Sequence, residues 1–210
     1  MKRLVILFMM VCAIGNVFAQ EDNQKNEVRT LFSDNKSLGF YGGFSIGYSQ
    51  INGKDALVSG GRAGMIFNHS TAVGLAGYGF VNNMDGYRWN NEDMLRYSLA
   101  GGYGGIFIEP ILGGLNPVHI TFPVLFGIGG VAQIRNYGTG YWEFPYYETP
   151  ESDVFFIVEP GVELEVNLAR FFRAAATLTY RYTSEVELFA IDPDVLKGLH
   201  FGLVFKFGKF

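Results

Sequence analysis

The sequence predicts an all-β protein, a closed eight-stranded antiparallel transmembrane β-barrel. Three observations lead to this fold class. The chain of 210 residues is 49% hydrophobic and only 17% charged, whereas ordinary globular domains carry about 25% charged residues. Bulky residues alternate with small or polar ones along long segments, which is the period of a strand. The chain also ends in LHFGLVFKFGKF, an alternating apolar strand, where most soluble chains end in polar residues.

Residues 1–19 are expected to be an export signal and are set apart from the fold. MKR supplies a positive start, and LVILFMMVCAIG is an apolar stretch too short to span a bilayer as a helix. Small residues then precede the expected cleavage site, and cleavage there removes Cys12, the single cysteine. Residues 20–37 are polar and nonperiodic, so we expect a flexible periplasmic lead-in to a barrel at 38–210.

Eight alternating segments are long enough to cross a bilayer at a tilt, which takes about 9 to 11 residues. The expected strands cover residues 38–51, 56–68, 71–82, 95–108, 118–132, 153–167, 171–183 and 197–209. An even number of strands permits closure into a barrel. Closure matters because unpaired edge groups in lipid each cost several kcal/mol.

The first strand carries large side chains on one face and small ones on the other. Its large face consists of Phe40, Phe44, Ile46 and Tyr48, opposite Gly43, Ser45, Gly47 and Ser49. The second and third strands alternate less cleanly, and their faces stay unassigned. The fourth strand sets Leu95, Tyr97, Leu99, Tyr103 and Phe107 against Arg96, Ser98, Ala100, Gly102 and Gly104.

The last four strands divide more sharply because charges lie on one face. In the fifth strand, alternate apolar residues from Val118 to Ile128 oppose His119, Thr121 and Gly127. The sixth opposes its valines and leucine with Glu159, Glu163 and Glu165, and the seventh opposes its aromatic row with Arg173 and Arg181. The eighth opposes Leu199, Phe201, Leu203, Phe205 and Phe207 with His200, Gly202, Lys206 and Gly208.

Side-chain volume predicts which face points outward. An eight-stranded bore is just wide enough to be filled by side chains, so rows of bulky residues from every strand would crowd it. We therefore expect the bulky face to contact lipid. The alternative fold is a soluble lipocalin-like carrier, whose apolar face would line a ligand cavity and whose charges would face water.

Two prolines fall inside the expected strands, where each removes a hydrogen-bond donor from the ladder. Pro123 interrupts the fifth strand and Pro160 the sixth. A turn at Pro160 would leave pieces too short to span the bilayer, so a bulge or kink is the preferred interpretation.

The combined features resemble small outer-membrane β-barrel proteins of Gram-negative bacteria, of the OmpA/OmpX-like eight-stranded size class. The resemblance covers residues 38–210 and rests on the signal peptide, the eight strands, runs such as GGYGG and LAGYGF, and the terminal FKFGKF. It implies an outer-membrane location, contact with outer-membrane lipids, and short periplasmic turns with longer external loops. It also implies that the barrel-insertion machinery reads the last strand through Phe205, Phe207 and Phe210.

The inward charges are the main candidate site. A structural lumen network is expected from buried groups that need charged partners, and its expected members are Arg96, Glu159, Glu163, Glu165, Arg173, Arg181 and Lys206, with Arg62 a further candidate. The bland interpretation is a salt-bridged plug; the alternative is a narrow ion-conducting pore or a proton-linked gate.

A second candidate is the aromatic connection between the fifth and sixth strands. It is expected either to continue the interfacial girdle of aromatic residues or to recognise an extracellular glycan or protein. Its candidate recognition residues are Tyr137, Tyr141, Trp142, Tyr146 and Tyr147.

Other functional classes have weaker support. A lipid-modifying enzyme stays an alternative, although His69, His119 and His200 show no obvious acid and nucleophile beside them. NNEDM and IDPDV lack the ligand spacing of a calcium loop, so no metal or other cofactor is expected. The acidic balance, 16 Lys and Arg against 20 Asp and Glu, disfavours nucleic acid as a partner. The expected protein is a monomeric, nonenzymatic barrel with a structural, protective or adhesive surface role.

Overall fold

The computed structural model describes residues 37–82, 95–137, 151–188 and 191–210, without the side chains of 95–97 and 134–137. The expected signal, residues 1–19, and the lead-in up to residue 36 lie outside this part. The described residues form strands β1 (Leu38–Ile51), β2 (Lys54–Phe67), β3 (Thr71–Asn82), β4 (Leu95–Leu112), β5 (Val118–Thr121), β6 (Val124–Tyr137), β7 (Glu151–Ala169), β8 (Phe172–Thr183) and β9 (Gly198–Lys209).

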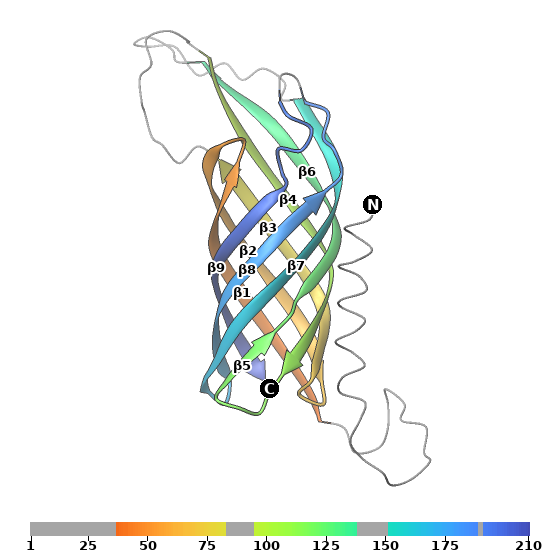
Figure 1. Ribbon diagram of the computed structural model, residues 1–210, viewed down its shortest axis with the longest axis vertical. Helices are drawn as coiled ribbons and strands as arrows, with labels where there is room; N and C mark the ends of the chain where they lie inside the picture. Colours follow the sequence, from red (N-terminus) through yellow and green to blue (C-terminus); the bar gives the residue numbers. More distant parts are fainter. Residues whose placement is uncertain (1–36, 83–94, 138–150, 189–190) are drawn as a thin grey trace, which may run out of the picture. The chain divides into compact units, whose positions relative to one another are not determined.

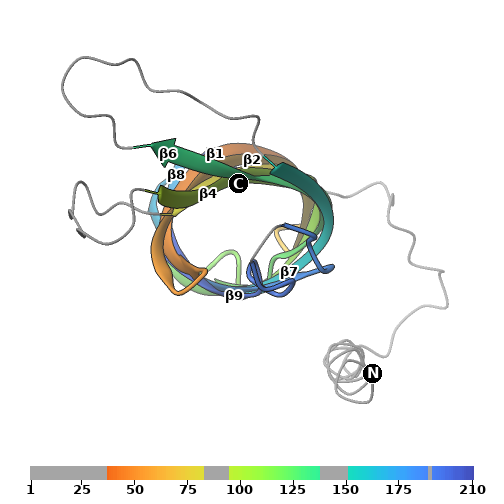
Figure 2. The ribbon, with the colours of Figure 1, turned by 90° about the horizontal axis from the view of Figure 1, so that it is seen from above.

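The strands close into one antiparallel ring (Figures 1 and 2). Neighbours in the sequence pair around the ring, and β1 pairs with β9 to complete it. β5 and β6 both pair with β4 on one side and β7 on the other, and the register continues unchanged from one to the other. They are therefore two halves of one barrel strand, and the expected closed eight-stranded antiparallel fold is confirmed.

The two prolines act differently. Pro123 separates β5 from β6 because it has no N–H for the ladder, although its carbonyl accepts a hydrogen bond from Gly161 N at 2.8 Å. Pro160 lies within the continuous strand β7, so it is not a turn. The pairing of β7 with β8 resumes after Pro160 in the same register, and the shift lies instead between Asn167 and Ala169. Of the bulge or kink expected at Pro160, the bulge is therefore wrong.

The two ends of the barrel differ in their connections. One end, called here the short-turn end, carries the β2–β3, β4–β5 and β7–β8 turns and the carboxyl terminus, at the bottom of Figure 1. The other, the long-loop end, carries the β1–β2, β3–β4, β6–β7 and β8–β9 connections. The β1–β2 hairpin at this end is a tight turn, where Asn52 and Gly53 both have positive φ, 57° and 65°. An Asn-Gly pair suits this conformation because both residue types tolerate the left-handed region.

The outer wall carries most of the bulky apolar rows. Exposed side chains include Phe40, Phe44 and Ile46 on β1, Phe126 and Ile128 on β6, Val154, Phe156 and Leu164 on β7, and Leu199, Phe201 and Leu203 on β9. Soluble proteins rarely expose so large an apolar surface to water. A membrane barrel carries such a surface where it contacts lipid. The lipocalin-like alternative needs the opposite arrangement, with charges outside and apolar rows inside.

One expected face is reversed. Leu99, Tyr103 and Phe107 of β4 were expected to face lipid, but they point into the bore, where they are 1%, 5% and 2% exposed. The outward positions of β4 are instead held by small residues such as Gly102 and Gly104 and, further along, by Ile106 and Ile108.

The reversal has a steric cause. β9 lies across the ring from β4, and between its large inward residues His200 and Lys206 the inward positions are held by the smaller Gly202 and Val204. This stretch of β9 leaves room in the bore for aromatic rings on the opposite strand. Side chains from all strands fill the bore together, so one strand can contribute large side chains where the facing strand contributes small ones.

Within the described residues, no helix is long and apolar enough to cross a membrane.

The reversed face of β4 predicts the effect of a charge at Ile106, which is 56% exposed on the outer wall. We expect Ile106→Lys to lower the free energy of unfolding by about 2–4 kcal/mol, because a lysine would face hydrocarbon. Reversible urea unfolding from lipid vesicles measures this. Ile106→Val serves as the control and should change stability by under about 1.5 kcal/mol. An unchanged Ile106→Lys variant would contradict the outward placement.

Candidate functional site

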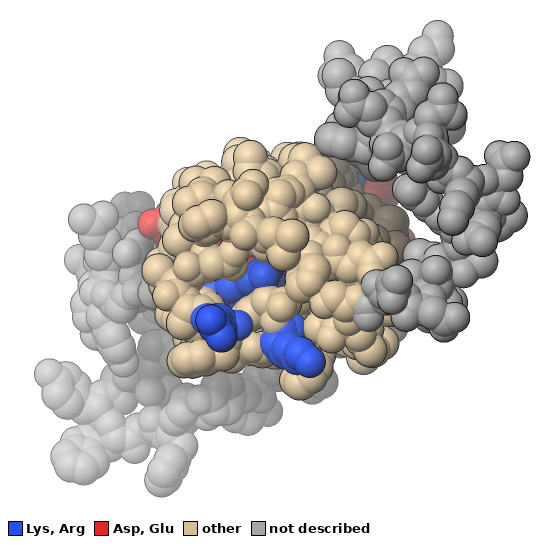
Figure 3. Space-filling model, turned by 90° about the horizontal axis from the view of Figure 1, so that it is seen from below, with Lys and Arg blue, Asp and Glu red and all other residues tan. Residues whose placement is uncertain are grey.

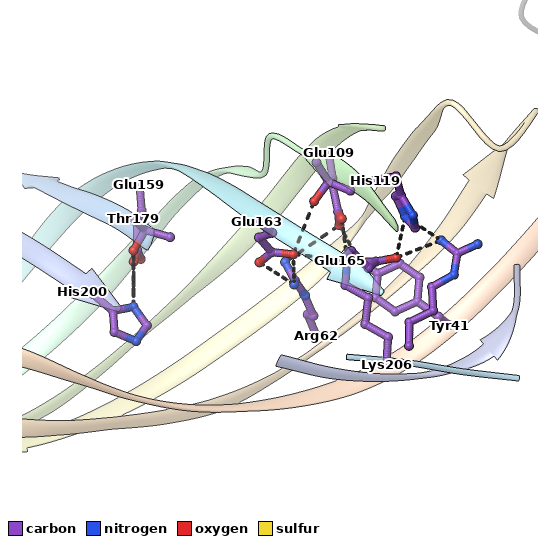
Figure 4. Close-up of polar contacts among 12 residues, drawn as sticks. Tyr41, Arg62, Glu109, His119, Glu159, Glu163, Glu165, Thr179, His200 and Lys206 are labelled. Atoms are coloured by element: carbon purple, nitrogen blue, oxygen red, sulfur yellow. Dashed lines mark hydrogen bonds and ion pairs between the residues drawn. The ribbon is translucent and has the colours of Figure 1, made fainter. Parts of the chain in front are cut away.

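The candidate site is the polar interior of the barrel, contributed by strands far apart in the sequence (Figure 4). We define the lumen network as the buried charged and histidine side chains Arg62, Glu109, His119, Glu159, Glu163, Glu165, Arg173, Arg181, His200 and Lys206. Each is at most 7% exposed. From the short-turn end, basic side chains gather in and beside the opening of the ring (Figure 3).

Lys206 is the centre of the network. Its ammonium contacts Glu109 Oε1 at 2.5 Å, Glu163 Oε2 at 3.2 Å, and Glu165 Oε2. Oxygen atoms of these three carboxylates lie within 4.8 Å of one another, so without a cation they would repel strongly. The lysine of β9 therefore joins carboxylates from β4 and β7 across the bore.

Arg62 of β2 forms the neighbouring ion pair. Its Nη2 donates to both oxygens of Glu163, at 2.6 and 2.7 Å, and its Nη1 lies 3.8 Å from Glu109 Oε2. Tyr41 Oη donates to the same Glu109 oxygen at 2.7 Å. The guanidinium carbon is 5.9 Å from the centroid of the Phe107 ring, so the inward aromatic wall packs against the charges.

A third group lies on the other side of Lys206. Arg173 Nη1 donates to Glu165 Oε1 at 2.9 Å, and His119 Nε2 lies 3.0 Å from the same oxygen. The Arg173 guanidinium carbon lies 3.9 Å from the centroid of the Phe210 ring. Phe210 also stacks on Tyr41, with ring centroids 6.2 Å apart. The last residue of the chain thus packs on the inside of the barrel.

Glu159 forms a separate cluster nearer the long-loop end (Figure 4). It accepts a hydrogen bond from Thr179 and lies 3.4 Å from His200 Nδ1. His200 packs against Gly47 of β1, where any Cβ would collide with the imidazole. Glycine is therefore required at position 47 for this histidine to occupy the bore.

Arg181 makes its hydrogen bonds with neutral groups among the described residues. Its Nη2 donates to Ser49 Oγ at 2.7 Å and its Nε to the Leu196 carbonyl at 3.1 Å. The second contact holds the β8–β9 connection against the rim. Leu196, Val186 and Ile51, each at most 1% exposed, close the long-loop end of the bore with apolar side chains.

The charges of the described lumen balance. Glu109, Glu159, Glu163 and Glu165 face the cations Arg62, Arg173, Arg181 and Lys206. Balance matters because an unpaired buried charge is far more costly than a paired one. These eight charged residues come from five strands, β2, β4, β7, β8 and β9. Their contacts across the bore are suited to holding those strands together.

The structure brings most of the sequence-predicted lumen residues together. Glu163, Glu165, Arg173 and Lys206 meet in one cluster with Arg62, while Glu159 and Arg181 lie apart from it. The Arg96 side chain lies outside the described part of the structure. Glu109 was missed because the fourth strand was expected to end at residue 108, whereas β4 continues to Leu112.

The other predicted residues take different places. Phe207 is 45% exposed on the outer wall, and Phe205 stacks with its neighbours there. Phe210 instead packs inside, so it does not share their face. Of the aromatic connection, Tyr141, Trp142, Tyr146 and Tyr147 lie outside the described residues, as does the side chain of Tyr137.

Among the residues that the structure describes, Glu109, Glu163 and Glu165 form the group that could hold a metal ion. Carboxylate oxygens suit hard cations. The Lys206 ammonium contacts all three of them, so a metal ion would first have to displace this side chain.

The similarity of this chain to known proteins lies in solved structures, of which Neisserial surface protein A supports the fold. No protein-family model and no curated protein sequence matches the chain. Neisserial surface protein A matches with a TM-score of 0.51 and 10% identity, over 84% of this chain and 100% of that one. The N-terminal β-barrel domain of Pseudomonas aeruginosa OprF matches with 0.48 and 13%, over 81% and 96%. Ail, the attachment invasion locus protein of Yersinia pestis, matches with 0.47 and 14%, over 84% and 99%.

The central role of Lys206 predicts a large loss of stability when it is neutralised. We expect Lys206→Met to lower the free energy of unfolding by about 3–5 kcal/mol, because three buried carboxylates lose a shared cation. Urea titration of the barrel in lipid vesicles provides the measurement. Lys209→Met on the same strand is the matched control, since Lys209 is exposed, and it should have little effect. Equal effects of the two substitutions would contradict the network.

Proposed function

We propose that this chain, which has the fold of small eight-stranded outer-membrane barrels, is a nonenzymatic integral outer-membrane protein with a structural, protective or adhesive surface role. The observation that carries the proposal is the combination of an apolar outer wall with a charge-balanced, side-chain-filled bore. Such a cylinder is stable in lipid and offers no wide path through it.

The filled bore also bears on the alternatives. A narrow pore would need a continuous aqueous path, but Lys206 and its three carboxylates occupy the bore, and apolar side chains close its long-loop end. A lipid-modifying enzyme that acts through the lumen histidine His200 would need a substrate site in the lumen. The lumen cavity beside the Glu159–His200 pair has a volume of only about 30 Å³, which is too small for a lipid.

Membrane fractionation combined with gel mobility tests the proposed location and closure together. We expect the protein in the outer-membrane fraction, migrating differently when heated, because a closed barrel resists unfolding by detergent until it is heated. In planar bilayers we expect no stable conductance, because the bore is filled. Recovery of the unheated protein in buffer without detergent would contradict the location, and stable ion conductance would contradict the closed lumen.

The adhesive role is the more specific part of the proposal, and it rests on the aromatic content of residues 137–147. Tyr and Trp side chains offer large flat surfaces on which a sugar or protein ligand could stack. Replacing residues 138–147 with a Gly-Ser linker should lower binding of expressing cells to glycan arrays or host cells. Heat-dependent mobility serves as the control for an intact barrel. Unchanged adhesion of a correctly folded variant would reject this role and leave the structural role standing.

A further inference from the structure

A small cavity separates the two polar clusters of the lumen. It is about 30 Å³ in volume and is lined by Glu159 and His200 from one cluster and by Arg62 and Glu163 from the other. Ala76 of β3 also lines it. We refer to it as the mid-lumen cavity.

The lining residues carry buried polar atoms that have no partner. Glu159 Oε2, Arg62 Nε and His200 Nε2 each lack a hydrogen bond, and the three side chains belong to residues that are 5%, 7% and 3% exposed. A buried donor or acceptor without a partner costs the full desolvation penalty of that group, and the cost is larger when the group is charged. A small ligand that both donates and accepts hydrogen bonds would satisfy these atoms.

The volume identifies the class of ligand. A water molecule requires at least about 10–15 Å³ of such space, so the mid-lumen cavity has room for about two. Water can donate to the Glu159 carboxylate and accept from the Arg62 guanidinium. An anion would suit Arg62 but would face the carboxylates of Glu159 and Glu163 in the same small space.

We propose that the mid-lumen cavity is a buried hydration site that holds two ordered water molecules between Glu159 and Arg62. The waters join the Glu159–Thr179–His200 cluster to the network around Lys206. The polar lumen is then one hydrogen-bonded column rather than two separate clusters. This inference concerns the interior of the barrel and holds whether or not the surface role proposed above is correct.

A high-resolution crystal structure of the barrel tests the site directly. We expect two water peaks within hydrogen-bond distance of Glu159 Oε2 or Arg62 Nε. An empty cavity would overturn the proposal. Crystals grown with bromide provide a second measurement, because anomalous signal in the cavity would identify an anion and also overturn it.

Filling the cavity distinguishes a wet site from a dry one in lipid. Ala76→Val places apolar volume in the cavity and displaces the waters, so we expect the unfolding equilibrium constant to rise about tenfold or more. Ala76→Ser is the control, because it adds a hydroxyl and little volume, and it should stay within about threefold of the wild type. A stabilised Ala76→Val variant would mean that the cavity is dry, and would contradict the proposal.

Discussion

The hydrocarbon core of a bilayer offers no hydrogen-bond partner to an unpaired peptide group. The pairing of β1 with β9 closes the sheet, so the peptide groups at its two edges bond to each other. Ten residue pairs join these two strands, from Phe40 with Lys209 to Ser49 with His200. Every other feature of the structure presupposes this closure. A closed ring has one lipid-facing surface and one enclosed surface, and the alternating side chains are sorted between them.

Closure also explains where the charges lie. Arg62 reaches Glu109 and Glu163, but Lys206 of β9 is the cation that contacts all three carboxylates, Glu165 included. The last strand therefore completes both the backbone ladder and the polar lumen. Removing either would leave groups in a low-dielectric interior without partners, which is why the network and the ring stabilise each other.

The sequence predicted strands and faces well where one face carried charges. Glu159, Glu163 and Glu165 could not face lipid, so β7 had a single acceptable orientation, and Arg173 and Arg181 oriented β8 in the same way. On β4 the face expected to point inward carried Arg96 together with small residues, and this charge and side-chain volume together misled. Glu109 held the missing signal, because it shares the parity of Leu99, Tyr103 and Phe107. Extending the strand by one residue would have placed a carboxylate in lipid unless that whole row pointed inward.

Other features could not be predicted from one strand at a time. That β9 leaves room for the aromatic wall of β4 depends on which strands face each other across the bore. The inward placement of Phe210 depends on its packing against Arg173 and Tyr41, which no local pattern encodes. The mid-lumen cavity likewise arises from residues of several strands. The register of one strand pair determines which residues are neighbours along the sheet. Which side chains meet across the bore depends on all the strands of the ring.

The side chains of the barrel are divided between a lipid face and a lumen face, and on β4 the aromatic row belongs to the lumen face. Methyl NMR in nanodiscs containing a spin-labelled lipid measures this directly. We expect strong broadening for outward methyls such as those of Ile106, Ile128 and Leu164, which are 56%, 64% and 52% exposed. We expect weak broadening for the methyls of Leu99 and Ile157, which are 1% and 2% exposed. Strong broadening of the Leu99 and Ile157 methyls, with Ile106 protected, would contradict it.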